Sequence, residues 1–533
     1  MKATDLLVQC LEKEGVEYVF GIMGKETLDL MDSLSKSDKI QFVNVRHEQG
    51  AAFMADVYGR LTKKVGVCLA TLGPGATNLL TGIASANLDH SPVVAITGQA
   101  GFERQHPESH QYLDIVKIFE PATKWSVQIK ESQSIAKIIR KAFRVAAMEK
   151  PGAVLIELPE NLAAQMISNQ PLPVVPIPKS EPIGQAIEEA LTLIAQSQKP
   201  LIIVGNGVIR QDAVADLHAF VEKLQSPVIH SFMAKGVLPK NHPLNFFTFG
   251  FSKKDEVLPL IEESDLLIVV GFDFIEQLPK EWNKKARSIL HIDALPAEMD
   301  EYYPVKVELV GDISQTFKTL NKQAIPTKSW FPIGNLKNQI KQAYQIDSDL
   351  KQNQMMTIEN ILKVIEKTST EDTIVISDVG SHKLSIARTY QPKQANRLII
   401  SNGLASMGIA LPGAIGAQLA CPAAPVICIT GDGGALMNIS ELETAKRLGI
   451  AFTIIILNNS TLKLEEQMMI ERFGNSFGAA FGNPDFVQLA RSFGIKGVRT
   501  SQLAEFEETL MEALTQNTEV TLIDVQMNID SHR

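Results

Sequence analysis

The chain has 533 residues, of which 45% are hydrophobic and 21% are charged, so it is long enough for several globular domains. Its formal net charge of −9 argues against a surface that binds nucleic acid. No apolar run reaches the roughly 18 residues of a membrane span, so no membrane partner is expected. Residues 1–15 read as an amphipathic helix with interleaved charge, not as a signal peptide, and we expect a cytoplasmic protein.

Short apolar runs rich in β-branched residues alternate with helical patterns along nearly the whole chain. The runs that we interpret as strands are 67–70, 93–97, 154–158, 201–205, 266–271, 289–293, 373–377, 426–430, 452–457 and 521–525. Runs that are apolar on both faces are typical of buried parallel strands. Their alternation with helices predicts layered α/β domains.

Two stretches without the strand pattern divide the chain. The first, 168–182, contains five prolines and predicts an extended linker. The second is polar and helical, and it runs through about 320–355. We therefore predict three doubly wound α/β domains with parallel sheets, over residues 1–167, 183–320 and 350–533.

The most specific local pattern begins where the predicted strand 426–430 runs into the sequence GDGG at 431–434. A helical pattern follows, and the next strand ends in NNST at 458–461. The carboxyl ends of consecutive parallel strands lie side by side in a right-handed βαβ unit. We therefore expect Asp432 and Asn459 to be neighbours.

One carboxylate and one amide oxygen at such a place could share a hard cation such as Mg²⁺, which takes its remaining ligands from water and phosphate. Gly433 and Gly434 would let backbone N–H groups approach phosphate oxygens closely. For GDG alone, the plainer alternative is a βα turn in which Asp432 caps the helix. The asparagine pair after the next strand argues against that alternative.

With a spacer of this length between GDG and NN, the chain resembles the thiamine-diphosphate enzyme family. The resemblance implies a pyrimidine-binding domain, a central domain and a diphosphate-binding domain, in the order of the three predicted domains. It implies that Asp432 and Asn459 bind Mg²⁺ through their side chains and that Thr461 binds it through its carbonyl. The cofactor contacts that it implies are Gly380, Ser381, His382, Ala405, Met407, Gly431, Asp432, Gly433, Gly434, Asn459, Thr461 and Leu464.

Two of these contacts have a specific implied role. Met407 would wedge between the two rings of the cofactor and bend it, and the carbonyl of Ala405 would accept a hydrogen bond from the pyrimidine amino group. Without the resemblance, residues 402–417 read as a packed helix start. A lone histidine such as His382 after a strand is usually a polar surface residue.

Glu48 lies where a predicted strand meets a helix within residues 41–62. Taken alone, it is a favourable charge at a helix N-terminus. The resemblance implies that it hydrogen-bonds the pyrimidine ring and so activates the cofactor. The segment GPGATN at 73–78 lacks the spacing and the basic residue of a P-loop. By resemblance it belongs to the partner chain's site, so a homodimer is the minimum, with Glu48 and Asp432 from different subunits, and we expect a homotetramer.

Stretches such as TLGPGATNLLTGIASAN resemble acetolactate synthases, above all the catabolic, flavin-independent type. The chain lacks the arginine-rich pattern of the biosynthetic type, so FAD is not expected. The resemblance implies decarboxylation of a 2-oxo acid, with pyruvate expected, and carboligation of the remaining unit to an acceptor. Gln111 matches a substrate-side glutamine and His110 lies beside it, although a polar loop is the alternative interpretation of this pair.

Three residues depart from the catabolic pattern: Glu26 replaces a lysine, Ala405 a larger polar residue and Glu465 a valine. Pyruvate decarboxylases place a catalytic glutamate where Glu465 stands. A carboxylic acid there could act as proton donor, so the alternative function is a non-ligating, aldehyde-forming 2-oxo acid decarboxylase. Glu465 could also be a solvated helix residue. A nucleotide-binding or regulatory α/β protein without catalysis is a third alternative, against which the intact cofactor motif argues.

Overall fold

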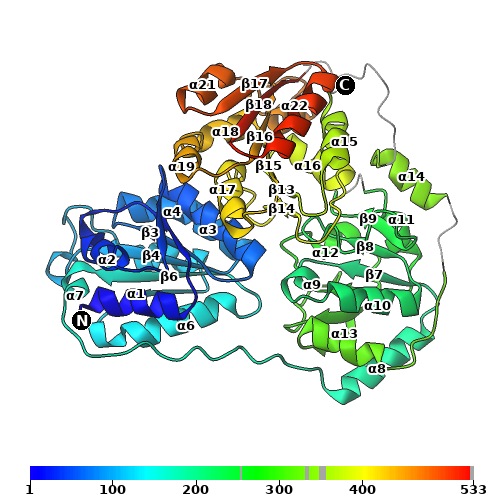
Figure 1. Ribbon diagram of the computed structural model, residues 1–533. Helices are drawn as coiled ribbons and strands as arrows, with labels where there is room; N and C mark the ends of the chain where they lie inside the picture. The colour runs from blue at the N-terminus through cyan, green and yellow to red at the C-terminus, as the bar shows by residue number, and fades with distance from the viewer. Residues whose placement is uncertain (252–254, 331–334, 347–355, 528–533) are drawn as a thin grey trace.

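The computed structural model describes residues 1–251, 255–330, 335–346 and 356–527. It contains three six-stranded parallel sheets, each covered by helices on both faces (Figure 1). The prediction of three doubly wound α/β domains is therefore confirmed. Every helix in the described ranges is too short or too polar to cross a bilayer.

The N-terminal sheet has the strand order β2-β1-β3-β4-β6-β5. Its strands are β1 (Tyr18–Gly21), β2 (Gln41–Asn44), β3 (Gly66–Ala70), β4 (Val93–Gln99), β5 (Trp125–Gln128) and β6 (Ala153–Pro159). The main helices are α1 (Ala3–Lys13), α3 (Glu48–Thr62), α4 (Pro74–Leu88) and α6 (Ile135–Ala147). Strands β3, β4 and β6 are buried along their whole length, which explains their uninterrupted apolar sequence.

The central sheet has a different order, β12-β11-β10-β7-β8-β9. Its strands are β7 (Pro200–Val204), β8 (Val228–His230), β9 (Asn245–Thr248), β10 (Leu266–Val270), β11 (Ser288–Asp293) and β12 (Val305–Val310). The main helices are α8 (Gly184–Gln196), α10 (Val214–Leu224) and α13 (Ile313–Asn321). The order reverses between β7 and β10, as it does in dinucleotide-binding folds.

The C-terminal sheet has the order β14-β13-β15-β16-β18-β17. Its strands are β13 (Ile374–Ser377), β14 (Leu398–Ile400), β15 (Val426–Gly431), β16 (Thr453–Asn458), β17 (Lys496–Thr500) and β18 (Thr521–Gln526). The main helices are α15 (Ile358–Thr368), α16 (Ser381–Thr389), α17 (Ala410–Ala420), α18 (Asp432–Met437), α19 (Glu441–Leu448), α20 (Lys463–Phe473) and α22 (Leu503–Gln516). Counted within each domain, this order equals that of the N-terminal sheet.

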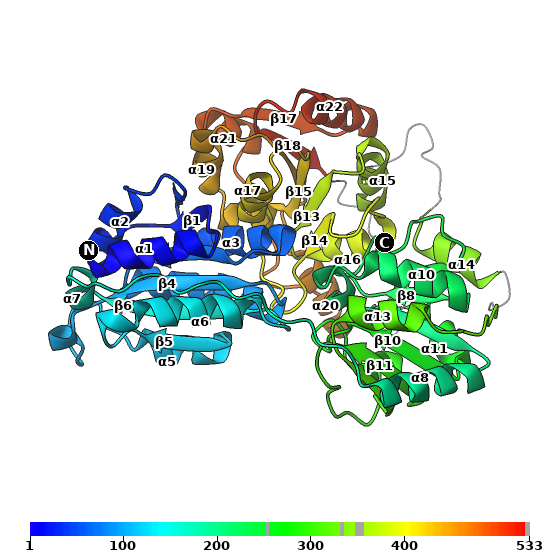
Figure 2. The same cartoon turned by 60° about the horizontal axis from the view of Figure 1, so that its bottom comes forward.

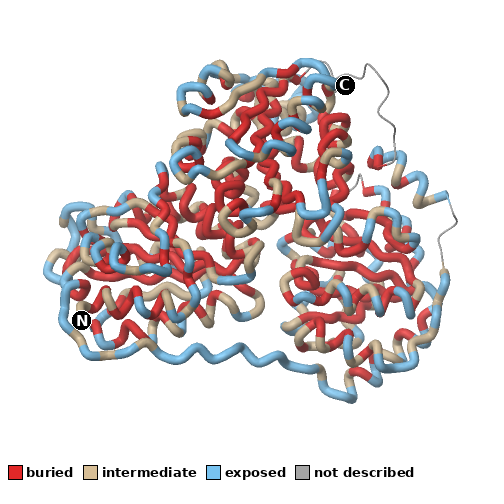
Figure 3. The backbone as a smooth tube through the Cα atoms, in the orientation of Figure 1, coloured by how far each residue is buried: buried red, intermediate tan, exposed pale blue. Residues whose placement is uncertain are grey.

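The N- and C-terminal domains pack against each other through α3 and α17, which lie side by side in both views (Figures 1 and 2). The two helix backbones approach closely, because a Cβ atom on Gly416 would lie 2.4 Å from the carbonyl oxygen of Met54. One hydrophobic core therefore continues from one domain into the other, as the buried tube at this junction illustrates (Figure 3).

Residues 168–182 contain no helix or strand, and most of this segment is exposed as it runs from the N-terminal to the central domain (Figure 3). This is the extended state that its prolines predict. Within the second predicted break, the structure contains α14 (Leu336–Ala343), while residues 331–334 and 347–355 lie outside the described residues. The predicted domain limits at 350 and 533 also fall on undescribed residues, and the domain boundaries stay predictions.

Candidate functional site

Asp432 and Asn459 lie at the carboxyl ends of two neighbouring strands. Strands β15 and β16 pair in parallel, with Gly431 opposite Leu457. Asp432 Oδ2 accepts hydrogen bonds from the backbone N–H of Asn459 at 3.0 Å and of Ser460 at 2.5 Å. The structure thus brings the two predicted metal ligands together, as the βαβ geometry requires.

The carboxylate of Asp432 is held by more contacts than the sequence motif indicates. Oδ1 accepts the backbone N–H of Gly433 at 2.9 Å. Oδ2 also accepts the side-chain amide of Asn483 at 2.7 Å, and the same amide donates to Asn458 Oδ1 at 2.9 Å. Asp432 therefore ties two strand ends to a third segment instead of only capping its own helix.

A cavity opens beside these strand ends. Most residues with an implied cofactor contact line it, and Glu465 lines it too. The predicted lining residues are Gly380, Ser381, His382, Met407, Gly431, Asp432, Gly433, Gly434, Asn459, Thr461, Leu464 and Glu465. Ala405 does not line this cavity, although it precedes Met407 by two residues. Sequence reasoning missed the remaining lining residues, which are Ile358, Val379, Leu457, Leu462, Lys463 and Met527.

The chemistry of the wall fits a diphosphate with a hard cation. The side-chain oxygens of Asp432 and Asn459 are the ligand types that Mg²⁺ prefers. His382 Nε2 and Thr461 Oγ1 are buried without a hydrogen-bond partner in the described structure, which is unusual unless a polar group binds there. Burial lowers the pKa of His382 to about 4, so its ring is neutral at pH 7.

Two glycines after Asp432 leave the space that a ligand and a neighbouring loop need. A Cβ atom on Gly434 would lie 2.9 Å from Asp378 Oδ2, and one on Gly433 would lie 3.4 Å from the methyl carbon of Met407. Asp378 itself is buried and accepts the backbone N–H of Gly408 at 2.8 Å. Burial raises the pKa of Asp378. Side chains at either glycine would therefore crowd the cavity or displace the Met407 loop.

The loop that carries Ala405 and Met407 is sharply bent. Ala405 has φ +52° and Gly408 has φ +90°, and only the glycine adopts such a value at low cost. The side-chain amide of Asn438 donates to the carbonyl of Gly408 at 2.9 Å. Asn438 also interrupts the single helix that the apolar pattern predicts, which the structure divides into α18 and α19.

Glu48 lies at the first position of α3, on the edge of the N-terminal sheet, and it does not line the cavity of its own chain. Its side chain is buried, and Oε2 accepts the side-chain amide of Asn78 at 2.9 Å. A Cβ atom on Gly75 would lie 3.3 Å from Oε1. The segment GPGATN therefore packs directly on this carboxylate.

Other sequence-predicted residues lie along the same edge. Glu26 is buried, accepts the hydroxyl of Thr71 at 3.2 Å and pairs with Arg104 at 3.4 Å. His110 and Gln111 are exposed, and a Cβ atom on Gly73 would lie 2.7 Å from the carbonyl oxygen of Gln111. This pair, predicted to lie on the substrate side, is thus next to GPGATN and outside the C-terminal cavity of the same chain.

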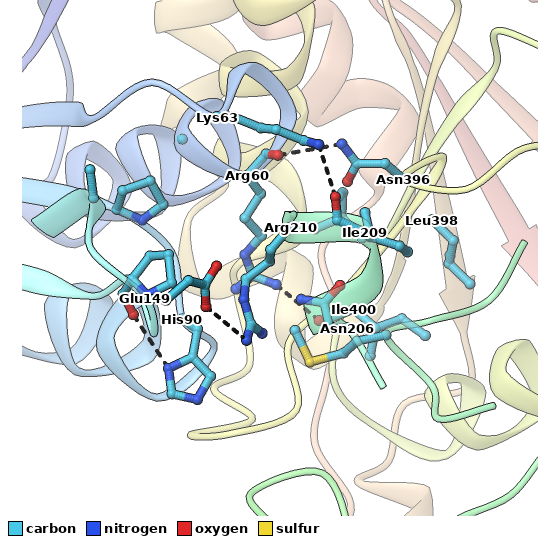
Figure 4. A pocket seen from close by; sticks show the side chains of 16 residues that line it. Arg60, Lys63, His90, Glu149, Asn206, Ile209, Arg210, Asn396, Leu398 and Ile400 are labelled. Carbon is cyan, nitrogen blue, oxygen red and sulfur yellow. Dashed lines mark hydrogen bonds and ion pairs between the residues drawn. The ribbon is translucent and has the colours of Figure 1, made fainter. Parts of the chain in front are cut away.

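A second cavity lies where the three domains meet (Figure 4). Arg60, Lys63, His90 and Arg210 line it, but each already has a partner within the chain. Arg60 binds Asp56 and Asp89, and its Nη1 donates to the carbonyl of Ile400 at 3.0 Å. The contacts of Lys63 with Asp212, of His90 with Asp273 and of Arg60 with Ile400 join the domains.

Comparison with known proteins agrees with this geometry. Residues 1–118, 187–320 and 378–525 match, in order, the N-terminal TPP-binding, central and C-terminal TPP-binding domains of thiamine pyrophosphate enzymes. An acetolactate synthase of Bacillus subtilis is 32% identical over 99% of this chain and 93% of its own. A probable acetolactate synthase large subunit of Methanocaldococcus jannaschii is 34% identical over 98% and 92%. An acetolactate synthase large subunit of Lactococcus lactis is 32% identical over 99% and 93%.

The chain therefore belongs to the thiamine pyrophosphate enzyme family. The prediction of an enzyme that depends on thiamine diphosphate and resembles acetolactate synthases is confirmed.

Proposed function

We propose that the protein decarboxylates a 2-oxo acid, with pyruvate as the first candidate, and ligates the remaining unit to an acceptor, as an acetolactate synthase does. The observation that carries the proposal is the pair Asp432 and Asn459 at adjoining strand ends, beside a cavity that most of the predicted cofactor contacts line. The names of the relatives support the same reaction.

In this proposal the C-terminal domain binds the diphosphate and Mg²⁺. Asp432, Asn459 and the carbonyl of Thr461 hold the ion, whose charge neutralises the phosphate oxygens. Gly380, Ser381 and the neutral ring of His382 contact the diphosphate from the end of β13. Gly433 and Gly434 have no side chain, so phosphate oxygens could approach the backbone closely at this turn. When bound, thiamine diphosphate supplies the carbon nucleophile and the sink for the electron pair that decarboxylation releases.

Glu48 holds a proton at the pyrimidine end of the cofactor in this proposal. Its carboxyl group lies buried against Asn78 and Gly75, so a ring nitrogen that meets it there is shielded from water. A hydrogen bond from this carboxyl group would hold a proton at that ring nitrogen. Gln111, with His110 beside it, would contact the substrate.

We also propose a homodimer, because Glu48 does not line the cavity beside Asp432 in its own chain. Helix α20 has no buried residue, and large apolar side chains on it and just after it face solvent: Met468 is 62% exposed, Phe473 63% and Phe477 88%. Met23 and Leu28 are exposed near Glu26 on the other edge. A second copy related by a twofold axis would cover both surfaces and bring Glu48 of one subunit to Asp432 of the other. Light scattering should give two or, as we expect, four times the chain mass of 58.5 kDa.

The second candidate function rests on Glu465. This residue lies in the first turn of α20 and lines the cavity, whereas its neighbour Glu466 pairs with Lys463 at 2.9 Å. A carboxylic acid that faces the cavity could protonate the carbanion and release an aldehyde. Its negative charge would also disfavour the approach of a second 2-oxo acid.

Incubation of the purified protein with pyruvate, thiamine diphosphate and Mg²⁺ tests both candidates. Acetolactate as the main product supports the carboligase, and acetaldehyde supports the decarboxylase. If Glu465 donates the proton, Glu465→Val should shift the product ratio towards acetolactate, and Glu466→Val should not. An unchanged ratio in Glu465→Val would remove the proton-donor role, and no consumption of pyruvate would remove pyruvate as donor.

A further inference from the structure

A buried carboxylate of the C-terminal domain holds the segment that precedes Glu48. Glu441, on α19, is fully buried, and its Oε1 accepts the backbone N–H groups of Arg46 and His47, both at 3.0 Å. A Cβ atom on Gly50 would lie 2.8 Å from the same oxygen. The first turn of α3 is therefore fixed by a side chain from another domain.

A buried carboxylate of the N-terminal domain does the same for the Met407 loop. Asp89, directly after α4, is 1% exposed, and its Oδ1 accepts the backbone N–H groups of Asn402 at 3.0 Å and Gly403 at 2.6 Å. Its Oδ2 accepts Arg60 Nη2 at 2.7 Å. Figure 4 shows Arg60 near Ile400, the last residue of the strand before this loop.

We call the contacts of Glu441 with residues 46–47 and of Asp89 with residues 402–403 the two clamps. They occupy equivalent places in the topology of their domains. Each held segment, 46–47 or 402–403, follows the second strand of its domain, β2 or β14. Each carboxylate belongs to the helical segment after the third strand of the opposite domain, namely α4 or α19. The helices that follow the held segments, α3 and α17, pack on each other. The same kind of contact, a buried carboxylate that accepts two backbone N–H groups of the other domain, therefore occurs twice in this interface.

We propose that Glu441 and Asp89 are positioning residues, Glu441 for Glu48 and Asp89 for the loop with Ala405 and Met407. The assignment rests on the proposed function, because it takes Glu48 and Met407 as contacts of thiamine diphosphate. The physical reason is that each clamp satisfies two buried N–H groups at once. Without the acceptor, those N–H groups must move towards water, and the segment moves with them.

The two clamps predict different defects. Loss of the Asp89 contacts displaces a loop in the binding cavity, so affinity for the cofactor should fall. Loss of the Glu441 contacts displaces a group that acts on the bound cofactor, so turnover should fall while affinity stays. A purely structural role would lower the melting temperature of both variants without this split.

Two measurements on the full-length protein separate these defects. Isothermal titration with thiamine diphosphate in the presence of Mg²⁺ gives the affinity, and pyruvate consumption at saturating cofactor gives the turnover. We expect Asp89→Ala to raise the Kd for thiamine diphosphate about tenfold. We expect Glu441→Met to lower kcat about tenfold and to keep this Kd within about threefold of the wild-type value. Glu441→Gln, whose amide oxygen still accepts both N–H groups, should restore turnover. Asp89→Asn should restore affinity in part, because it keeps an acceptor but loses the ion pair.

Asp255→Ala is the matched control, because Asp255 is a buried carboxylate that accepts the N–H groups of Gly250 at 2.6 Å and Phe251 at 3.1 Å in the central domain. It should lower the melting temperature and leave Kd and kcat unchanged. Should the Asp89 and Glu441 variants not fold, Gly403→Ala and Gly50→Ala crowd the same clamps without removing a charge, and they should show the same split. A Cβ atom on Gly403 would lie 2.6 Å from that of Leu88.

The outcomes separate this inference from the proposed function. A wild-type protein that does not bind thiamine diphosphate overturns the proposed function, and the clamp assignment with it. If the wild-type protein binds the cofactor but both clamp variants lose affinity and turnover to the same extent, the clamp assignment alone is overturned.

Discussion

The N- and C-terminal sheets have the same strand order but carry different groups at their carboxyl ends. In the C-terminal sheet, the third and fourth strands end at Asp432 and Asn459, beside a cavity with unpartnered polar atoms. In the N-terminal sheet, the second strand leads to the buried Glu48, and the third leads to GPGATN. In the proposed function the first edge binds the ion and the diphosphate, and the second binds the pyrimidine ring. Side chains at the strand ends, not the fold, separate the two roles.

The largest effect is expected from removing the charge at the C-terminal edge. Asp432→Ala should weaken Mg²⁺-dependent binding of thiamine diphosphate by about 100-fold or more, because a hard cation loses its one carboxylate ligand. Titration calorimetry with and without Mg²⁺ measures this. Asp312→Ala, which removes a helix-capping carboxylate in the central domain, is the control and should leave the affinity unchanged. Retained affinity in Asp432→Ala would contradict the assignment of this edge.

At the N-terminal edge, substitution of Glu48 should lower turnover and leave the binding of thiamine diphosphate unchanged. Glu48→Gln keeps the size of the side chain but cannot share its proton with the ring, so we expect kcat to fall by about 10²-fold. The Kd for thiamine diphosphate should stay close to that of the wild type. Glu26→Gln, at another buried glutamate of this edge, should have a much smaller effect on kcat. A Glu48→Gln variant that binds weakly but turns over normally would reverse the two roles.

The sequence predicted the centre of each domain better than its margins. All ten predicted runs are strands, because strands such as β4 and β15 are apolar on both faces. Edge strands such as β12 and β17 were missed because they are partly exposed and carry charged residues. A strand with one solvated face lacks the continuous apolar run that was used to find the others.

The candidate site likewise has one part that could be predicted from the sequence and one part that could not. The GDG and NN motif is local, so the neighbourhood of Asp432 and Asn459 could be predicted from two strands and a helix. Asn483 lies 51 residues from Asp432 in the chain, and Asp89 lies 313 residues from Asn402. These contacts depend on how segments and domains pack, and no spacing in a single sequence contains that information.

The effect at His382 is absent at pH 7 and appears only as the pH falls, so it distinguishes the C-terminal edge by its response to pH. Burial lowers the pKa of this histidine from 6.5 to about 4, so the folded chain binds the proton less readily than the unfolded chain. Its contribution to stability is therefore complete above about pH 6.5 and is lost as the pH falls towards 4, by roughly 3 kcal/mol. Urea unfolding of the cofactor-free protein between pH 7 and 4.5 should show a steeper loss in the wild type than in His382→Gln. His106→Gln, at an exposed site, should behave as the wild type does. Equal slopes in all three proteins would mean that the ring of His382 is reached by water, and that the cavity at the C-terminal edge is more open than its buried, unpartnered Nε2 indicates.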